Sequence, residues 1–566
     1  MIAIVVLSAM LLLGIAYVVY GRFIASRLGL DDSRPTPAVT VNDGVDYVPA
    51  SAPLLIGQHF SAISAAGPIV GPVIAALWFG WLPALLWIVP GAILVGGVHD
   101  FASLAASVRH KAASMGELVR EYLSPHSYVL FLIFVWISLI YVIIAFTDIT
   151  AGTFVVAVSG EAFGPGVAVS SFLYIGLGTA MGVCLYKFKM NLWLATSIFL
   201  PLVLAVIWYG PHAPASVISF VSSLSVKQWD MVILAYCFIA SLLPLWLLLQ
   251  PRGYLGGWLL YLVMAASLFG AIFGGFHIAY PAINVEQFKS VLNGKPVFPL
   301  LFIMIACGAC SGFHGIVCAG TTSRQLCRES DARTVGYGAM LLESLVAVLA
   351  VATVMMISRG DALLSTDPNF IYAHGIARYL ELGGLPFGLG LGFALLAFST
   401  FVYDTLDVCT RLARYILQEV LGWQGKAGAF TATLITLLLP ALFLLCTREK
   451  GYLVAWPIFG TTNQLLASLT LLVISIWLIK TGRPAFYALI PMVFMIGMTM
   501  WALFLQIKTF LLAVPAFFAG SEPFRPDVLI SGVVGLLLFV VAAVLISQAV
   551  EALVVHRRGA ATEKSV

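Results

Sequence analysis

Two Gly-Pro pairs interrupt an apolar stretch near the start of the chain. Gly67-Pro68 and Gly71-Pro72 lie four residues apart within residues 63–79. Each proline lacks a backbone N–H donor and disfavours helix at the residue before it. Hydrocarbon cannot satisfy the carbonyl groups that such a break frees, so the break must line a cavity or be buried in protein. Broken helices of this kind build the substrate and ion sites of secondary transporters. The pattern predicts such a site here, with a proline-kinked packing helix as the alternative.

The composition is that of a membrane protein built from helices. Of the 566 residues, 61% are hydrophobic and 10% are charged, and the mean hydropathy is +1.03. Soluble domains carry about 25% charged residues, so we predict an all-α protein that crosses the membrane many times. The net charge of +4 is spread through loops, and the sequence has no Lys/Arg-rich tail and no glycine-rich phosphate loop. This pattern indicates membrane topology, and no nucleic-acid partner is expected.

About fifteen stretches reach the roughly 20 apolar residues that a membrane-spanning helix needs. They are residues 2–21, 53–79, 82–107, 127–157, 166–186, 190–209, 231–249, 256–277, 299–320, 334–357, 386–410, 428–446, 452–479, 485–506 and 527–551. The first has no positive charge before it and no small-residue cleavage site. We therefore expect a first transmembrane helix there and not a removable signal peptide.

Positive charges orient these spans. With the N-terminus outside, roughly two thirds of the 29 Lys and Arg residues fall in segments on the cytoplasmic side, as the positive-inside rule requires. Arg448 and Lys450 fall outside and fit this arrangement least well. The sequence therefore predicts a multi-pass membrane protein whose C-terminus is cytoplasmic.

A second proline-containing span gives the chain a weak internal symmetry. Leu243-Pro244 lies five spans after the break at Gly67–Pro72. An odd offset gives the two segments opposite orientations, which an inverted repeat requires. We therefore predict a core of two five-helix repeats with discontinuous helices. The predicted boundaries are 1–52 for the first helix and its loop, 53–425 for the core, with repeats at about 53–209 and 231–420, and 426–566 for peripheral C-terminal helices.

Asp148 lies in the predicted span 127–157, among the hydroxyl groups of Thr147, Thr150 and Thr153. An ionisable residue in hydrocarbon costs about 2.5–3.5 kcal/mol on insertion scales, so each one is a functional candidate. A carboxylate among hydroxyl oxygens suits Na⁺, and it also suits a proton carrier. We predict that Asp148 binds the coupling cation and that Thr150 helps to bind substrate. A structural hydrogen-bonded cluster is the alternative.

The predicted span 299–320 contains Ser311 and His314, which are three residues apart and share a helix face. Gly312 and Gly315 beside them permit close backbone approach. Histidine can change its charge near physiological pH, so we predict that Ser311 and His314 handle the coupling ion or proton. A histidine that only satisfies packing contacts is the alternative.

The predicted span 386–410 and the residue after it contain Asp404, Asp407 and Arg411. Asp407 and Arg411 are four residues apart, a spacing that pairs opposite charges on a helix. We predict structural ion pairs at the cytoplasmic end of this helix, with a gating role as the alternative. Other polar groups within spans, none of them specific alone, are His99, Asp100, Glu343 and the residues Thr461–Gln464.

The eight cysteines mostly fall in apolar segments, and we expect reduced, packed thiols. Cys307 and Cys310 have the C-x-x-C spacing, but no second pair follows them. The nine histidines are scattered, without the pairs that haem needs. We therefore predict no metal, no catalytic residue and no cofactor other than a coupling cation, H⁺ or Na⁺. An integral membrane enzyme or redox subunit is the alternative class.

Several ordered segments between about residue 50 and residue 480 resemble the carbon starvation protein A family. They are Ala66–Pro72, Leu82–Trp87, Gly97–Phe101, Ser311–His314, Gly320–Ser323, Gly336–Ser344, Thr405–Asp407 with Arg411–Glu419, and Trp456–Ala467. The family consists of bacterial inner-membrane transporters linked to nutrient starvation, associated with uptake of short peptides or pyruvate. The resemblance implies a fold related to the amino acid–polyamine–organocation transporters.

These features together predict a secondary active symporter that imports small carboxylates, short peptides or pyruvate, with H⁺ or Na⁺. A half-helix N-terminus offers free amides and a positive dipole end to a carboxylate. We therefore expect the substrate at Ala66, Gly67, Pro68, Gly71 and Pro72. A passive channel or a starvation sensor with the same fold is the alternative. The expected partners are a small-molecule substrate and the lipid bilayer, and the sequence specifies no oligomeric state.

Overall fold

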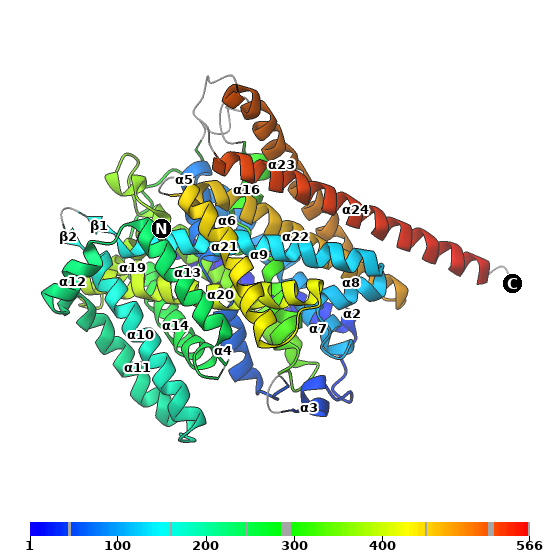
Figure 1. The fold of residues 1–566 in the computed structure, drawn as a ribbon, viewed down its shortest axis with the longest axis horizontal. Helices are drawn as coiled ribbons and strands as arrows, with labels where there is room; N and C mark the ends of the chain where they lie inside the picture. Colours follow the sequence, from blue (N-terminus) through cyan, green and yellow to red (C-terminus); the bar gives the residue numbers. More distant parts are fainter. Residues whose placement is uncertain are drawn as a thin grey trace.

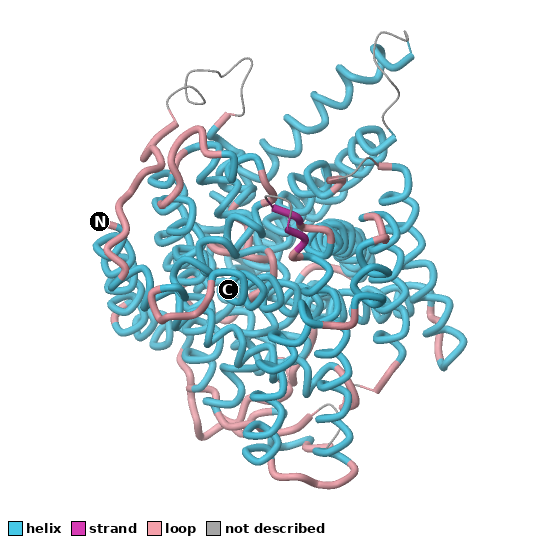
Figure 2. Tube along the Cα trace, turned by 90° about the vertical axis from the view of Figure 1, so that its left-hand side faces the viewer, coloured by secondary structure: helices cyan, strands magenta, loops and turns pink. Residues whose placement is uncertain are grey.

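The structure is a computed structural model that describes residues 1–43, 47–158, 161–244, 246–284, 296–447, 450–518 and 526–563. Within these ranges the regular structure is helical, apart from two short antiparallel strands, β1 (Ala157–Val158) and β2 (Glu161–Ala162). Figure 2 shows this small hairpin against the surrounding helices. The prediction of an all-helical fold is confirmed.

The helices of the first half are α1 (Ile2–Val18), α2 (Tyr20–Leu28), α3 (Pro37–Val41), α4 (Ala52–Ile63), α5 (Gly67–Phe79), α6 (Trp81–Gly91), α7 (Gly97–Arg109), α8 (Met115–Tyr122), α9 (Pro125–Phe154), α10 (Gly164–Tyr186), α11 (Leu192–Tyr209), α12 (Ala215–Ser222), α13 (Val226–Leu242) and α14 (Leu249–Phe273). Those of the second half are α16 (Val297–Met304), α17 (Gly312–Val317), α18 (Ala339–Met355), α19 (Pro368–Glu381), α20 (Phe387–Leu421), α21 (Gly425–Cys446), α22 (Tyr452–Lys480), α23 (Phe486–Phe518) and α24 (Pro526–Glu563).

Three wide π-helical turns adjoin these helices: η1 (Ala92–Gly96) joins α6 to α7, η3 (Cys318–Thr322) continues α17, and η4 (Arg333–Gly338) precedes α18. Two short 3₁₀ turns are η2 (Gly210–His212) and η5 (Ala362–Ser365). Turns of the π type often mark functional sites within helices. All three π turns lie in helices that surround the candidate site described below.

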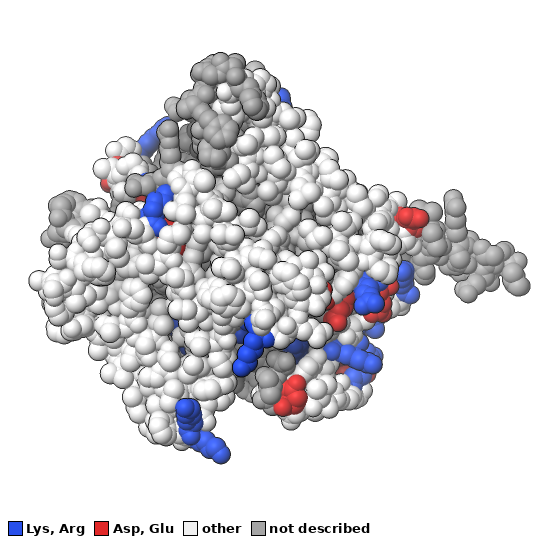
Figure 3. Space-filling view, in the orientation of Figure 1, with Lys and Arg blue, Asp and Glu red and all other residues white. Residues whose placement is uncertain are grey.

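Twelve helices of the described residues are long and apolar enough to cross a membrane, and up to 14 spans result if each of two bent helix pairs counts as one. The predicted count of about fifteen is therefore not reached. The predicted span 299–320 is absent from this set because it is divided into pieces that are each too short. In Figure 3 charged side chains are sparse over the middle of the visible face, as lipid contact requires.

The first interrupted helix consists of α4 and α5, which meet at residues 64–66 with a bend of 44°. Pro68 lies in the first turn of α5, where a backbone N–H would have no helical partner in any case. Pro72 lies inside α5. The sequence predicted this break, and the structure places it just before the first Gly-Pro pair.

The second interrupted helix consists of α16 and α17, separated by the non-helical residues 305–311. The sequence predicted one continuous span here, because residues 305–311 contain no proline. The segment packs tightly on its neighbours, since a Cβ atom at Gly308 would lie 2.7 Å from Cβ of Ala347 in α18.

Leu243-Pro244, which the sequence assigned to the second break, lies between two helices. α13 ends at Leu242 and α14 begins at Leu249. Proline there ends a helix, as its missing donor favours. The interruption inside a span is instead at residues 305–311. The two five-helix repeats and their boundaries stay a prediction.

The interrupted helices lie together in the core. α5 packs against α16 and α18, and α17 packs against α22, α7 and α4. Figure 1 shows α5, α6, α16 and α22 in one region of the molecule, while α24 runs away from it. This arrangement buries the irregular backbone of both breaks in protein, as a low-dielectric membrane demands.

We predict that Gly71→Ala destabilises the protein by about 1–3 kcal/mol, the usual cost of overpacking. A Cβ atom at Gly71 would lie 2.1 Å from the backbone oxygen of Met304, and backbone cannot move aside as a flexible side chain can. Thermal unfolding of the detergent-solubilised protein measures the loss. Gly14→Ala is the matched control, because nothing lies within 4 Å of its Cβ position in α1. Equal melting temperatures for the two variants would contradict the close packing at Gly71.

Candidate functional site

The candidate site lies where the two interrupted helices touch. A Cβ atom at Gly67 would lie 2.4 Å from Sγ of Cys307, and the Cβ position of Gly308 is 3.7 Å from Cα of Pro68. Gly67 and Gly71 therefore let α5 lie directly on the segment that interrupts the second helix. These two predicted site residues pack against protein in this structure.

The turn at the first break leaves one polar group without a partner. The carbonyl of Ala66 accepts hydrogen bonds from the amides of Ile69 (3.1 Å) and Val70 (2.8 Å). Ser64 is buried, and its hydroxyl has no hydrogen-bond partner among the described residues. Buried polar groups in proteins are nearly always paired, so this hydroxyl is a candidate ligand-binding group.

Asn463 in α22 fastens both sides of the second break. Its Oδ1 accepts a hydrogen bond from the amide of Phe313 (3.0 Å). Its Nδ2 donates to Oγ of Ser311 (3.0 Å) and lies 3.3 Å from Sγ of Cys307. Phe313 is in the first turn of α17, where amides have no partner within the helix. Ser311, predicted to bind a cation, is thus part of a clamp that holds the broken helix to α22.

His314 in α17 lies between two carboxyl groups from two other helices. Its Nδ1 is 2.9 Å from Oδ2 of Asp100 in α7, and its Nε2 is 3.3 Å from Oε2 of Glu343 in α18. All three side chains are fully buried. A neutral imidazole has one donor and one acceptor nitrogen, so it cannot donate to both carboxylates. The His314 group, defined as Asp100, His314 and Glu343, therefore has a place for one further proton, on the ring or on a carboxyl group.

The two carboxyl groups of the His314 group differ in their surroundings. Oδ1 of Asp100 is 2.7 Å from Nδ1 of His99, so both oxygens of Asp100 face histidine nitrogens. Neither oxygen of Glu343 has a hydrogen bond among the described residues, although Oε2 lies at ion-pair distance from His314. A buried carboxylate without hydrogen bonds is costly, so Glu343 is the member that gains most from binding a proton.

Asp148 and Thr150 have contacts of a structural kind. Oδ2 of Asp148 accepts a hydrogen bond from the amide of Tyr452 at 2.7 Å, and Tyr452 is the first residue of α22. A carboxylate at a helix N-terminus interacts favourably with the helix dipole. The hydroxyl of Thr150 donates to the carbonyl of Phe146 in its own helix (2.7 Å). Asp148 therefore holds the start of α22 against α9. Its binding of a coupling cation stays a prediction.

Arg252 in α14 neutralises Asp404 and Asp407. Its Nε and Nη2 donate to Oδ1 of Asp404 at 3.0 and 2.7 Å, and Nη2 is 2.7 Å from Oδ2 of Asp407. Tyr236 donates its hydroxyl to the same oxygen of Asp407 at 2.9 Å. The Arg252 side chain is fully buried, so this cluster is a desolvated ion network that joins α13, α14 and α20.

The predicted pairing of Asp407 with Arg411 is wrong. Nη2 of Arg411 donates to the backbone oxygens of Ala240 (2.9 Å) and Leu243 (2.7 Å). Arg411 thus satisfies the last carbonyl groups of α13, which a basic side chain does well. Arg252, which is distant in sequence, forms the ion pair with Asp407 that the local spacing predicted for Arg411. The gating role of these residues stays a prediction.

The sequence singled out His314 but not its partners. Asp100 and Glu343 are among the polar groups within predicted spans, and no spacing connects them because they lie on separate helices. Arg252 falls between the predicted spans 231–249 and 256–277, whereas it is fully buried. The sequence does mark Asp100, Glu343 and Arg252 as candidates, because each is an ionisable residue within or next to an apolar run.

Comparison with known proteins identifies the family. The sequence model described as carbon starvation protein CstA matches residues 1–369 and 360–502. The chain belongs to the CstA family. The segments that resemble the family in the sequence analysis, from Ala66–Pro72 to Trp456–Ala467, lie within these matched ranges. The resemblance seen in the sequence is confirmed.

Curated relatives of the chain are named as transporters. The chain is 32% identical to the peptide transporter CstA of Helicobacter pylori (strain ATCC 700392 / 26695), over 89% of this chain and 81% of that protein. It is 30% identical to the peptide transporter CstA of Bacillus subtilis, over 97% and 96%. It is 29% identical to the pyruvate/proton symporter BtsT of Escherichia coli, over 91% and 83%. The chain is therefore a multi-pass membrane transporter of the CstA family and not an enzyme.

Two solved structures align with most of the chain at low similarity. A manganese transporter of Eremococcus coleocola aligns with 14% identity and a TM-score of 0.44, over 92% of this chain and 99% of that one. MhsT in complex with L-phenylalanine aligns with 13% identity and a TM-score of 0.45, over 88% and 99%.

We predict that Arg252→Gln destabilises the protein by about 3–5 kcal/mol, because it leaves two buried carboxylates without their countercharge. Arg411→Gln is the matched control and should cost less, about 1–3 kcal/mol, because only hydrogen bonds to backbone oxygens are lost. Thermal unfolding in detergent compares the two. If Arg411→Gln were the more damaging change, the assignment of Arg252 as the partner of Asp407 would be refuted.

Proposed function

We propose that this protein is a proton-coupled symporter that imports small carboxylate nutrients, short peptides or pyruvate, across the bacterial inner membrane. The observation that carries the proposal is the His314 group. A histidine lies there between two buried carboxyl groups, beside the break in the second interrupted helix. The names of the CstA and BtsT relatives agree with both substrates and, for BtsT, with the proton.

The geometry of the His314 group supports the proposal of proton coupling. His314 is in α17, Asp100 in α7 and Glu343 in α18. Adding or removing one proton changes the charge at the meeting point of three helices, in a medium where charge is strongly felt. A protonation change therefore favours one arrangement of these helices over another. This gives the proton a differential affinity for two states, which coupled transport requires.

The proposed substrate site is the break in the first helix. The start of α5 at Gly67 lies against Cys307 in the second break, and the buried hydroxyl of Ser64 lies three residues before it in the sequence. A helix N-terminus favours an anion through its dipole, and the Ser64 hydroxyl adds a hydrogen-bond donor. We assign the substrate carboxylate to Ser64, Ala66 and the first turn of α5, with Pro68 and Pro72 shaping this turn.

The proposed topology places the N-terminus outside and the C-terminus in the cytoplasm. The excess of Lys and Arg in alternate loops supports this orientation. Import then carries substrate and proton in the same direction, from outside to inside. The family is named for carbon starvation, a condition in which the uptake of carboxylate nutrients serves the cell.

We predict that the purified protein in proteoliposomes accumulates labelled pyruvate or a labelled dipeptide under an inward proton gradient, and not under an Na⁺ gradient. His314→Gln and Glu343→Gln should each lower the accumulation ratio by about tenfold or more, within the range of coupling between linked ligands. His212→Gln, at an exposed histidine on the molecular surface, should accumulate substrate as the wild type does.

Two outcomes would reject this proposal. Uptake that equilibrates without accumulating under either gradient would indicate a passive channel. Accumulation driven by Na⁺ alone, unaffected by His314→Gln and Glu343→Gln, would move the coupling site elsewhere, with Asp148 as the next candidate.

The charge of Asp148 is tested separately from its capping role. Asp148→Asn keeps a side-chain oxygen that accepts from the amide of Tyr452, so α22 should stay docked and the melting temperature should change little. If Asp148 binds the coupling cation, as the sequence predicts, the variant should lose gradient-driven uptake. Normal uptake by a folded Asp148→Asn variant would leave the residue with a structural role alone.

A further inference from the structure

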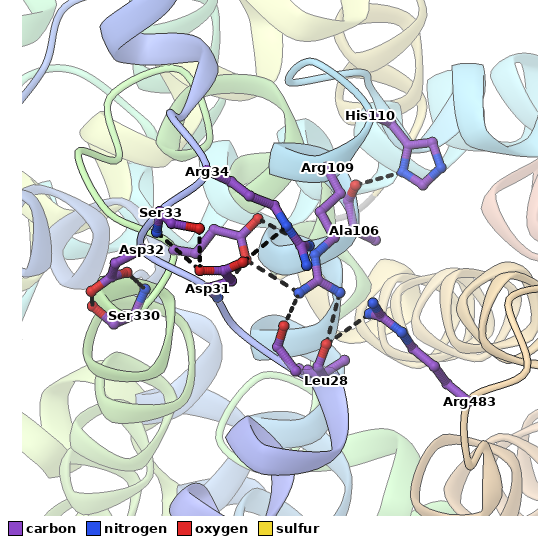
Figure 4. A network of polar contacts seen from close by, with 12 residues as sticks. Leu28, Asp31, Asp32, Ser33, Arg34, Ala106, Arg109, His110, Ser330 and Arg483 are labelled. Carbon is purple, nitrogen blue, oxygen red and sulfur yellow. Dashed lines mark hydrogen bonds and ion pairs between the residues drawn. The ribbon is translucent and has the colours of Figure 1, made fainter.

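The chain between α2 and α4 is fastened to the loop that follows the second interrupted helix. Ser330 donates its amide (2.8 Å) and its hydroxyl (2.7 Å) to the carboxylate of Asp32. Thr36 donates its hydroxyl to the carbonyl of Leu326 (2.5 Å). We call residues 29–41 the connector. Figure 4 shows Asp32 and Ser330 on one side of this network and Arg109 with Arg483 on the other.

A cavity of about 440 Å³ lies between the connector and the end of α7. Arg34 and Thr40 line it from the connector, Arg109 and Lys111 from the end of α7, and Glu329 from the loop after the second break. Three cations thus line the cavity against one carboxylate. Asp31 lies behind Arg34, with Oδ2 at 3.4 Å from its Nε, so the local charge stays positive when Asp31 is included.

Glu329 is already engaged by protein groups. Its Oε2 accepts from Nη2 of Arg109 (3.2 Å) and from the amide of Asp31 (3.0 Å). Its Oε1 is 4.0 Å from Nη1 of Arg34, a weak ion pair. Hydrogen bonds from Ser33 lower the pKa of Asp31, so that carboxylate is charged at neutral pH. Glu329 and Asp31 therefore both have partners within the protein, and other hydrogen-bond donors of the cavity have none among the described residues.

The spare donors belong to Lys111 and Arg109. The ammonium of Lys111 makes no hydrogen bond or ion pair within the described part of the chain, and its backbone is left-handed, with φ of 59°. Nε of Arg109 is buried without a hydrogen-bond partner in those residues, and the Arg109 side chain is only 10% exposed. Buried guanidinium donors without acceptors are rare in proteins, so an acceptor is expected at Arg109.

A second guanidinium increases the demand for an anion. Nη1 of Arg109 and Nη1 of Arg483 both donate to the carbonyl of Leu28, at 2.8 and 2.7 Å (Figure 4). Both guanidinium groups also lie within 6 Å of the Trp477 ring centre. Two like charges on one acceptor repel each other, and an anion nearby relieves that repulsion.

We propose that the cavity binds a phosphate-class anion, either free inorganic phosphate groups or the phosphate of an anionic lipid headgroup, through Arg34, Arg109 and Lys111. Guanidinium and ammonium groups are the side chains that recognise phosphate oxygens best. Basic pockets at membrane surfaces commonly take lipid phosphates. The anion would connect the connector to the end of α7.

The test measures binding of two probes to the full-length purified protein. Isothermal titration with pyrophosphate and with dioctanoyl phosphatidylglycerol, at low salt in detergent, covers both sources of phosphate. We expect at least one probe to bind once per chain. Lys111→Gln and Arg34→Gln should each weaken that binding by about tenfold, the loss of one charge-assisted contact. Melting temperatures without probe verify that both variants are folded.

Lys189→Gln is the matched control, because Lys189 is also exposed and also has left-handed backbone, with φ of 51°. It should bind the probe as the wild type does. Binding of pyrophosphate alone identifies a soluble ligand, and binding of the lipid alone identifies a headgroup site. Both results support the proposal. Absence of binding by either probe, or binding that Lys111→Gln and Arg34→Gln leave unchanged, would overturn it.

Discussion

At the contact between Gly67 and Cys307, the two interrupted helices approach so closely that no side chain fits on the glycine. This contact constrains what surrounds it. Backbone groups freed in a membrane need partners from protein, and here the partners come from neighbouring helices. Oδ1 of Asn463 accepts a hydrogen bond from the amide of Phe313. Trp87 donates its ring N–H to the carbonyl of Ile305 at 3.3 Å. The breaks are therefore stable only while α5, α16, α17 and α22 stay assembled.

Buried charge is distributed over the same assembly in two separate groups. Arg252 with Asp404 and Asp407 joins α14 to α20, and its guanidinium contacts both carboxylates. The His314 group joins α7, α17 and α18, and Glu343 lacks a hydrogen bond there. Both groups contain carboxyl oxygens without hydrogen bonds among the described residues, but a guanidinium stays charged whereas a histidine gains or loses a proton near physiological pH. We therefore propose a structural role for the first group and the coupling role for the second.

The sequence predicted the helical class and the first break, and it singled out His314, because each depends on local pattern: hydropathy, Gly-Pro pairs and one histidine in an apolar run. It missed the second break at residues 305–311, because no proline marks it, although this segment packs tightly against Ala347 and α5. It paired Asp407 with Arg411 by helical spacing, while Arg252 is the partner across more than 150 positions of chain. Contacts between distant segments, such as Asp100 with His314, leave no trace in local spacing.

The central claim is that the His314 group exchanges a proton when substrate binds. Calorimetry of substrate binding in buffers of different ionisation enthalpy counts the protons exchanged, using whichever of pyruvate or dipeptide the uptake assay identifies. The account predicts a net exchange of about one proton per substrate in the wild type, through linkage of proton and substrate binding, and none in Glu343→Gln. The same proton count in Glu343→Gln, with substrate still bound, would contradict the account.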